Sequence, residues 1–224
     1  MRCGRICPAG LDTSGTAGTI CVNPDVPGDA MPENLASKIG RALRRVRARE
    51  SDLVFHHAAM DAVPAVIRVT SPAFSDHGKL PALYTADGEG ISPPLAWEGV
   101  PREAASVVIV VEDADSPAPH PLVNAIVWAL PGADGALPAG ALHQAGDLVP
   151  ADAWMGRTSL LTVGYLPPHP PSGHGIHRYA FEVFALDWSP RHDPQLAPGR
   201  GQVEEWLNGH AIAKGMLIGL YERP

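Results

Sequence analysis

After residue 65 the chain alternates between short apolar runs and turn-forming residues. Such runs, rich in β-branched and aromatic residues, predict short strands. One of them, Ser106–Val111, is almost wholly apolar, which predicts a strand covered on both faces. The predicted strands are Ala65–Thr70, Ser106–Glu112, Ala125–Leu130, Leu160–Tyr165, Tyr179–Leu186 and Leu217–Tyr221.

Two segments show helical spacing instead. In Glu33–Arg49 the apolar positions Leu35, Ile39, Leu43 and Val46 fall on one face, and six lysines and arginines occupy much of the remainder. This basic amphipathic helix has two interpretations: it lies on an anionic membrane surface, or its apolar stripe packs on the domain or a second subunit. We expect the second.

The other helical segment is Gln202–Lys214, near the end of the chain. Its inward positions are Val203, Trp206, Leu207 and Ala211, and Gly215 is expected to end the helix.

Composition supports a chain of short elements. Gly (23) and Pro (24) are abundant among the 224 residues, which favours many loops over long helices. Apolar residues make up 45% and charged residues 18%, as in a folded domain. We expect residues 1–30 to be a disordered extension, 31–64 a basic helix and linker, and 65–224 a single β-dominated domain.

Charge is unevenly distributed along the chain. The net charge is −7, yet residues 53–224 hold nine lysines and arginines against eighteen acidic residues, whereas residues 31–52 are basic. An acidic body argues against a nucleic-acid groove.

Cysteine and hydropathy patterns bear on location. The cysteines Cys3, Cys7 and Cys21 all precede the main domain, which fits a reducing compartment, and they are too few for a zinc site. No run of 18 apolar residues predicts a transmembrane helix, and no apolar signal region follows Arg2 and Arg5. We therefore expect a cytoplasmic protein with no metal and no stable membrane insertion.

The loop Pro167–Tyr179, reading PPHPPSGHGIHRY, has the composition of a binding site. Its four prolines stiffen the backbone and its two glycines allow unusual dihedral angles. It presents His174 and His177 just before a predicted strand, a common position for ligand contacts.

A second polar cluster follows the strand Ser106–Val111. Asp113 and Asp115 are two residues apart, so in extended backbone their side chains would point the same way. They are either turn formers or site residues. His120 and Asn124 follow closely.

Four ordered motifs resemble the phosphatidylethanolamine-binding protein family, in its bacterial Raf-kinase-inhibitor-like branch. The resemblance extends over about 155 residues, from Val66 to Tyr221. The matching segments are Ser71-Pro72-Ala73-Phe74, Asp87–Trp97 (DGEGISPPLAW), Asp113–Pro117 (DADSP), and Pro170-Pro171 with Gly175–Tyr179 (GIHRY) and Phe184–Asp187.

The resemblance implies a mainly β fold, an antiparallel β-sandwich with a few short helices, including a C-terminal helix before the last strand. It also implies a small pocket for phosphate-like anions, including phospholipid headgroups, and no cofactor. By motif, the pocket residues would be Asp113, Asp115, His177 and Tyr179, with Pro170 in one wall and His174 as a further candidate.

Two departures from the family pattern bear on affinity. Asn124 stands where the family usually has a histidine, and Ala114 replaces the first proline of the aspartate motif. Because asparagine cannot supply positive charge, we expect weaker and less pH-sensitive phosphate binding than in typical relatives.

Aspartates ought to repel phosphate. We therefore expect Asp113 or Asp115 to accept a hydrogen bond from His177 and keep it cationic, while glycine-loop N–H groups and the Tyr179 hydroxyl complete an anion nest. Arg178 points away from His177 in a strand and is expected to form a structural salt bridge. His120 is expected on a solvated turn and His169 at the rim.

These observations favour a non-enzymatic binding protein for small anionic or phosphorylated groups, which could act on a kinase or protease partner as relatives do. The alternative is an acid–base or metal-assisted hydrolase using the Asp/His cluster. Neither a G-x-S-x-G nor a His-x3-His motif is present to support it. A homodimer formed through the basic helix is a further possibility.

Overall fold

The computed structural model describes residues 33–142, 153–191 and 197–224. The expectations for residues 1–30, including the three cysteines, lie outside the described residues. The helices are α1 (Glu33–Leu43) and α2 (Arg200–Leu207), and single-turn 3-10 helices form at Glu50–Asp52, Val54–His56, Ala58–Met60 and Ala82–Tyr84. The strands are β1 (Arg68–Thr70), β2 (Gly78–Lys79), β3 (Leu95–Glu98), β4 (Ser106–Asp113), β5 (Leu122–Pro131), β6 (Gly135–Leu137), β7 (Trp154–Met155), β8 (His177–Leu186) and β9 (Ala211–Tyr221).

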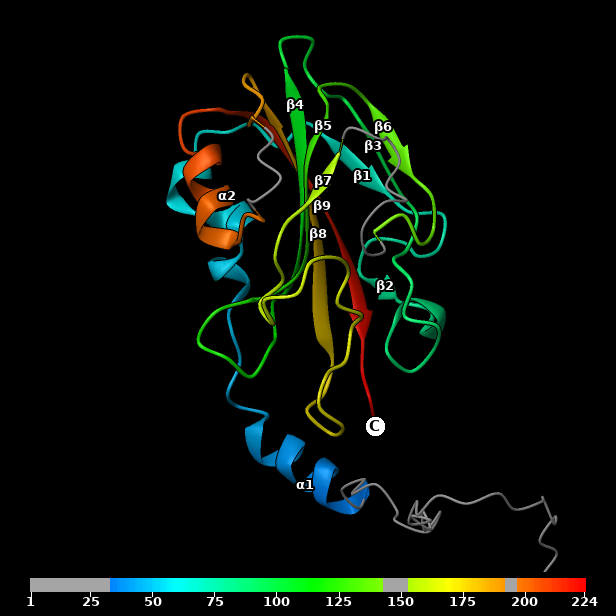
Figure 1. The fold of residues 1–224 in the computed structure, drawn as a ribbon. Coiled ribbons are helices and arrows are strands. Elements are labelled where there is room, and N and C mark those ends of the chain that lie inside the picture. Colours follow the sequence, from blue (N-terminus) through cyan, green and yellow to red (C-terminus); the bar gives the residue numbers. More distant parts are fainter. Residues whose placement is uncertain (1–32, 143–152, 192–196) are drawn as a thin grey trace, which may run out of the picture. The chain divides into compact units, whose positions relative to one another are not determined.

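The strands form two sheets, and the predicted mainly β fold is confirmed. One sheet has the order β1-β3-β6 and the other the order β2-β9-β8-β4-β5-β7. All pairs are antiparallel except β2 with β9. The three-stranded sheet and α2 lie on opposite faces of the larger sheet (Figure 1).

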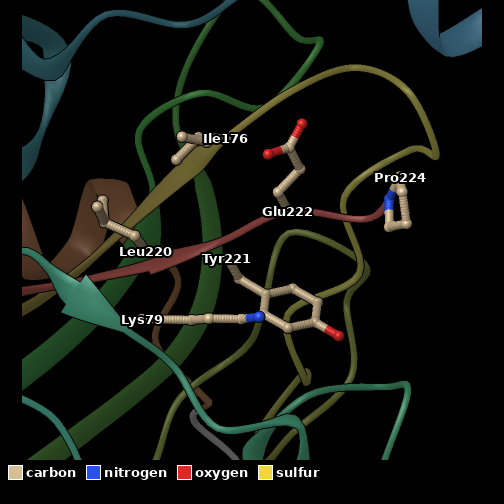
Figure 2. Close-up of a pocket in the computed structure, with 6 residues that line it drawn as sticks. All are labelled: Lys79, Ile176, Leu220, Tyr221, Glu222 and Pro224. Atoms are coloured by element: carbon tan, nitrogen blue, oxygen red, sulfur yellow. The ribbon is translucent and has the colours of Figure 1, made fainter.

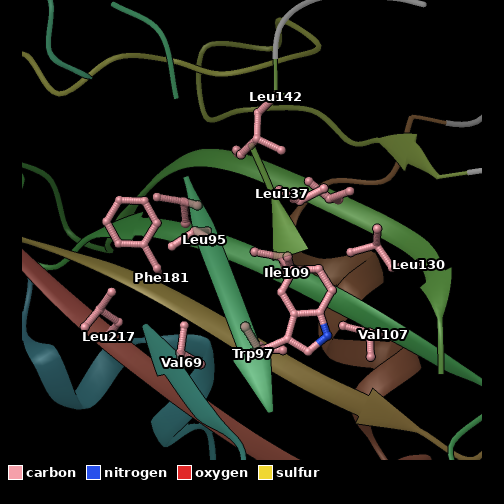
Figure 3. Packing of buried hydrophobic residues seen from close by; sticks show 14 of the residues in the cluster. Val69, Leu95, Trp97, Val107, Ile109, Leu130, Leu137, Leu142, Phe181 and Leu217 are labelled. Carbon is pink, nitrogen blue, oxygen red and sulfur yellow. The ribbon is translucent and has the colours of Figure 1, made fainter. Parts of the chain in front are cut away.

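The main core fills the space between the two sheets. Val69, Trp97 and Leu137 from the small sheet pack against Ile109 and Phe181 from the large one (Figure 3). On the outer face, β4 and β8 are covered by α2 and the segment of 3-10 helices, through residues including Val54, Met60, Trp128, Val203 and Trp206. Every residue of β4 is buried, which confirms the strand covered on both faces.

One predicted strand is wrong, and the C-terminal helix before the last strand is confirmed but shorter than predicted. Leu160–Tyr165 forms no strand: Leu161 has φ 62°, and the side chains of Leu160 and Leu161 are 61% and 76% exposed. The second helix ends at Leu207, since Gly209 takes φ 84° and Ala211 then pairs with Leu186 in the sheet. Pairing with β8 overrides the helical spacing of that segment.

The first helix is also shorter than predicted. It ends at Leu43, so the arginines that follow lie in non-helical backbone. Its apolar stripe does not pack on the domain as expected, because Leu35 and Ile39 remain 44% and 43% exposed.

Two buried glutamates, Glu112 and Glu182, bind the segment of 3-10 helices to the outer face of the large sheet. Glu112 accepts hydrogen bonds from Arg200 Nε (2.7 Å) and from the backbone N–H of Val54 (2.9 Å). Glu182 accepts from the N–H of Phe55 (3.2 Å), and its other oxygen has no partner among the described residues. Burial raises the pKa of Glu182 well above its usual value, and the nearby Glu112 raises it further.

Replacing Glu182 with glutamine is expected to stabilise the protein at alkaline pH. A carboxyl whose pKa is raised on folding binds its proton more tightly in the folded state, so stability falls as pH rises from the unfolded pKa towards the folded one. Glutamine does not titrate, so it removes this loss. The free energy of unfolding of Glu182→Gln should exceed that of the wild type by about 1–2 kcal/mol at pH 8 and should equal it near pH 4. Urea unfolding at both pH values measures it, with the exposed Glu103→Gln as the control. An equal gain at both pH values would contradict the assignment.

Candidate functional site

The polar residues that the sequence singled out converge at one end of the large sheet. Asp113, the last residue of β4, lies opposite Tyr179 of β8 and Leu122 of β5. A register shift in the β4–β5 pairing leaves Asn124 without an opposite residue, as in a β-bulge. Tyr179, Asp113 and Asn124 are therefore contributed by three adjacent strands.

A chain of hydrogen bonds runs through the two histidines of the loop. His177 Nδ1 lies 2.8 and 3.0 Å from the two carboxylate oxygens of Asp113, and its Nε2 lies 2.7 Å from Nδ1 of His174. Nε2 of His174 lies 2.9 Å from the Leu43 carbonyl oxygen and 3.2 Å from that of Val46. Both imidazoles are fully buried.

This geometry fixes the number of protons on the pair. His177 Nδ1 faces a carboxylate and His174 Nε2 faces carbonyl oxygens, so both outer nitrogens must donate. The 2.7 Å contact between the inner nitrogens is a hydrogen bond only if one of them carries a proton. Three protons on four nitrogens make the pair a monocation, balanced by Asp113.

His177 is the imidazole that contacts an aspartate, and that aspartate is Asp113. Burial lowers the pKa of His174, the neighbouring charges of His177 and Arg47 lower it further, and the Leu43 carbonyl only partly offsets them. His177 lies directly beside the Asp113 carboxylate. The expected Asp–His177 hydrogen bond is therefore made by Asp113.

Asp115 belongs to a separate ion-pair cluster. Its Oδ2 accepts from Arg178 Nε (2.8 Å) and its Oδ1 from Arg178 Nη2 (3.0 Å) and Arg47 Nη1 (3.1 Å). Burial alone would raise the pKa of Asp115, but the hydrogen bonds and charge of Arg178, with help from Arg47, lower it below its usual value. Arg178 also pairs with Glu50, which confirms its structural role.

The two aspartates do not point the same way as predicted. β4 ends at Asp113, and the chain turns through Ala114 and Asp115. Within this turn, Asp113 Oδ1 accepts the Asp115 backbone N–H at 2.9 Å. The structure brings Asp113 to the histidines and leaves Asp115 to the arginines.

Two buried polar atoms at the site have no hydrogen-bond partner in the described part of the chain. One is the hydroxyl of Tyr179, and the other is Oδ1 of Asn124, whose amide nitrogen donates to the Leu166 carbonyl at 2.8 Å. Burial raises the pKa of Tyr179, and the Asp113 charge raises it further. The phenol therefore stays protonated and can donate, while the asparagine oxygen can only accept.

The proline segment lies beside these atoms. Pro168 and Pro170 are buried, and the Pro168 carbonyl accepts the Ala86 N–H at 3.0 Å. His169 is exposed and contacts Arg223 at 2.7 Å, as expected for a rim residue. His120 is exposed in the turn after the aspartates and is not brought to the pair of histidines.

The sequence did not reveal the cover over the histidines. Arg47 donates to the carbonyls of His174 (2.6 Å) and Ile176 (2.8 Å), and the Ala48 N–H donates to the Ser116 carbonyl (2.9 Å). The only signal in the sequence is the density of arginines between residues 44 and 49. This segment lies over His174 and makes the site nearly inaccessible to solvent.

A cavity of about 360 Å³ adjoins the site (Figure 2). Tyr221 lines it and pairs with His177 in the β8–β9 register, while its hydroxyl donates to Asp87 at 2.7 Å. The lining residues are Lys79, Ile176, Leu220, Tyr221, Glu222 and Pro224.

The sequence profile of the phosphatidylethanolamine-binding proteins matches residues 70–222. The chain belongs to this family. A relative from Methanothermobacter thermautotrophicus, described as a UPF0098 protein, is 39% identical over 67% of this chain and 95% of its own length. One from Chlamydia trachomatis serovar D, with the same description, is 36% identical over 70% of this chain and 99% of its own.

Solved structures of family members agree with the fold. A phosphatidylethanolamine-binding protein homologue from Chlamydia trachomatis superposes with a TM-score of 0.63, 34% identity, and 71% and 99% coverage of the two chains. YbcL of E. coli, a further member of the family, gives a TM-score of 0.66 at 27% identity and covers 71% of this chain and 100% of its own. The family match begins at residue 70, so α1 and the cover lie outside it.

Within residues 33–142, 153–191 and 197–224, no group of three or more His, Cys, Asp or Glu side chains is arranged to hold a metal ion. Over the same residues, no helix has the length and apolar character needed to cross a membrane.

Proposed function

We propose that this chain is a non-enzymatic binding protein for a small phosphate-bearing anion, free or as a phospholipid headgroup. Its site would consist of His177, Tyr179, Asn124 and Asp113, with Pro170 in the wall. The observation that carries the proposal is the pair of buried, unpartnered polar atoms on Tyr179 and Asn124. A buried group without a partner costs about 1–3 kcal/mol, and a ligand would recover that cost.

The two atoms and the histidine pair favour a ligand with both acceptors and donors. Phosphate oxygens would accept from the Tyr179 hydroxyl, and the monocationic histidine pair would offset part of their charge. The Asn124 oxygen needs a donor, which a protonated phosphate oxygen or the ammonium of phosphoethanolamine provides. Entry requires movement of the proline wall or the arginine cover, because these side chains are almost fully buried.

The hydrolase alternative gains no support from the described residues. Both ring nitrogens of His177 already have partners, so neither is available as a general base without rearrangement. No described contact points to a kinase or a protease, and the proposal is therefore limited to the small ligand.

Titration calorimetry with inorganic phosphate and with phosphoethanolamine tests the proposal. Tyr179→Phe removes the unpartnered hydroxyl and should weaken binding about tenfold or more, because a hydrogen bond to a charged group is lost. Tyr221→Phe is the matched control, since Tyr221 lines the adjoining cavity. Binding weakened by Tyr221→Phe alone would place the anion in that cavity and overturn the site.

Asn124→His restores the residue that the family usually has at this position. The new imidazole adds a titratable positive charge, so binding should become tighter and should strengthen as pH falls through the range near 6.5. The same calorimetry at pH 6 and pH 8 measures this effect. Equal affinities and equal pH profiles for the two proteins would contradict the proposed position of the anion.

A further inference from the structure

α1 is held to the rest of the domain by one small face. Gly40 is buried there, and a Cβ atom at this position would lie 2.0 Å from the Ser172 carbonyl oxygen. Arg44, just beyond the helix, donates from Nε to the Gly173 carbonyl at 2.7 Å. A Cβ atom on Gly173 would lie 2.9 Å from the Ser37 carbonyl oxygen. Ser37, Gly40 and Arg44 therefore make up the docked face.

The apolar stripe of α1 points elsewhere. Leu35 and Ile39 are four residues apart, so their side chains lie one above the other on the helix. They are 44% and 43% exposed, and Val46, just after the helix, is 48% exposed. Ile39 and Gly40 are about 100° apart around the axis, so the stripe lies beside the docked face and remains open to solvent.

Unpaired cations border this stripe. Lys38 on the helix and Arg45 just beyond it are exposed beside the stripe. Arg41 is also exposed, but its stem lies on the docked side, where Cγ would be 3.4 Å from a Cβ atom on Gly173. No ion pair or hydrogen bond of these three side chains occurs within the part of the chain that the structure describes. Arg44 and Arg47, in contrast, are both used in contacts with the loop that carries His174.

We propose that these exposed residues, Leu35, Lys38, Ile39 and Arg45, form a surface that binds an anionic phospholipid bilayer. We call it the outer face of α1. Its aliphatic side chains would enter the boundary between headgroups and acyl chains, and its bases would meet lipid phosphates. This surface is distinct from the candidate anion site, and the proposal does not depend on that site.

Charge complementarity fixes the orientation of the domain on the bilayer. Residues 53–224 carry eighteen acidic residues against nine lysines and arginines, so an anionic bilayer repels most of the domain. The outer face of α1 combines exposed cations with exposed apolar side chains. The domain would therefore approach the bilayer with α1 towards the lipid.

The shape of the surface favours a bilayer over a second protein. A stable protein interface buries about 800 Å² of accessible surface on each partner and needs complementary shapes. A single helix with Leu35 and Ile39 as its main apolar side chains supplies only a narrow, convex strip. Lipids rearrange around such a strip, and each base near an anionic surface strengthens binding about fivefold.

His174 connects α1 to the candidate anion site. Its ring donates to the carbonyl of Leu43, the last residue of α1. The loop that carries His174 therefore contacts the docked face of α1, and the bilayer would lie on a different face of the helix.

Flotation of the full chain with vesicles tests the proposal. Equal parts of phosphatidylcholine and phosphatidylglycerol should bind the protein at low salt and release it at high salt, and pure phosphatidylcholine should bind it weakly. Lys38→Glu with Arg45→Glu should weaken binding about 25-fold or more. Leu35→Ser with Ile39→Ser should weaken it about tenfold.

Matched controls separate this surface from general charge and from the anion site. Lys79→Glu with Arg102→Glu makes the same charge change at two exposed positions outside α1 and should weaken binding far less. Excess soluble phosphoethanolamine at constant ionic strength should leave vesicle binding unchanged, because it competes for the anion site and not for the outer face of α1.

Three results would overturn the proposal. The first is failure of the wild type to bind anionic vesicles. The second is an equal loss in the two charge-reversed variants. The third is a dimer in sedimentation that Leu35→Ser with Ile39→Ser dissociates, since a second copy would then cover the stripe.

Discussion

Replacing Arg178 with alanine is expected to lower the free energy of unfolding by about 3 kcal/mol at pH 7. Both oxygens of Asp115 accept hydrogen bonds from this guanidinium, and the Asp115 side chain is only 6% exposed. Removing one member of a buried pair leaves a charge that is both desolvated and uncompensated, which costs about 3–5 kcal/mol. Arg47 remains beside Asp115 and keeps the expected loss at the lower end of that range.

The pH dependence of this loss follows from the lowered pKa of Asp115. A carboxyl with a lowered folded pKa contributes stability above its unfolded pKa, near 3.9, and that contribution disappears as pH falls through the folded value. The difference in unfolding free energy between wild type and Arg178→Ala should therefore be largest at neutral pH and shrink as pH falls below the unfolded pKa of Asp115. Urea unfolding at a series of pH values measures it.

Arg68→Ala is the matched control, because Arg68 and its partner Glu98 are 69% and 62% exposed. An exposed pair of this kind contributes little, so no measurable change in stability is expected. Similar losses in the two variants, or a loss for Arg178→Ala that does not vary with pH, would contradict the assigned role of the buried pair.

Asp113→Asn is expected to destabilise the protein by about 2–3 kcal/mol at pH 7 and to loosen the attachment of α1. Asparagine can still accept the His177 hydrogen bond, but it cannot balance the extra proton of the histidine pair. The protonation of the pair should therefore change, since a neutral His177 can accept from the new amide at Nδ1 and donate from Nε2 to His174.

Nitrogen-detected NMR of the imidazoles and amide hydrogen exchange of residues 33–48 follow both effects. Asp76→Asn is the control, since Asp76 pairs with His77 but both side chains are more than half exposed. A variant that keeps the wild-type imidazole protonation between pH 6 and pH 9 would disprove the shared monocation.

The large strands could be predicted from sequence because burial and β propensity agree there. Ser106–Val111 is apolar at nearly every position, and the structure buries it on both faces. The failures occur where local pattern and tertiary pairing disagree. Leu160–Tyr165 has strand-like composition but contains the positive φ of Leu161, and Ala211 follows helical spacing yet joins β9.

The site was predictable as a set of residues but not as a hydrogen-bond network. Motifs placed His177, Tyr179 and Asp113 together, and strand alternation separated Arg178 from His177. The role of His174 depends on the carbonyls of Leu43 and Val46, more than 120 residues earlier in the chain. Every residue has a backbone carbonyl, so the sequence does not show which carbonyls will accept a hydrogen bond. Neither the protonation of the two histidines nor the arginine cover could therefore be predicted.

The strand order of the large sheet has a consequence for folding during synthesis. β9, the last strand, pairs with β8 on one side and with β2 on the other, where Gly78 meets Gly219. The early strand β2 has no place in this sheet until β9 has been made. Contacts this distant in sequence slow folding. Strands β4, β5 and β8 can pair as soon as β8 has been made, whereas β2 should stay unpaired on the ribosome until β9 emerges.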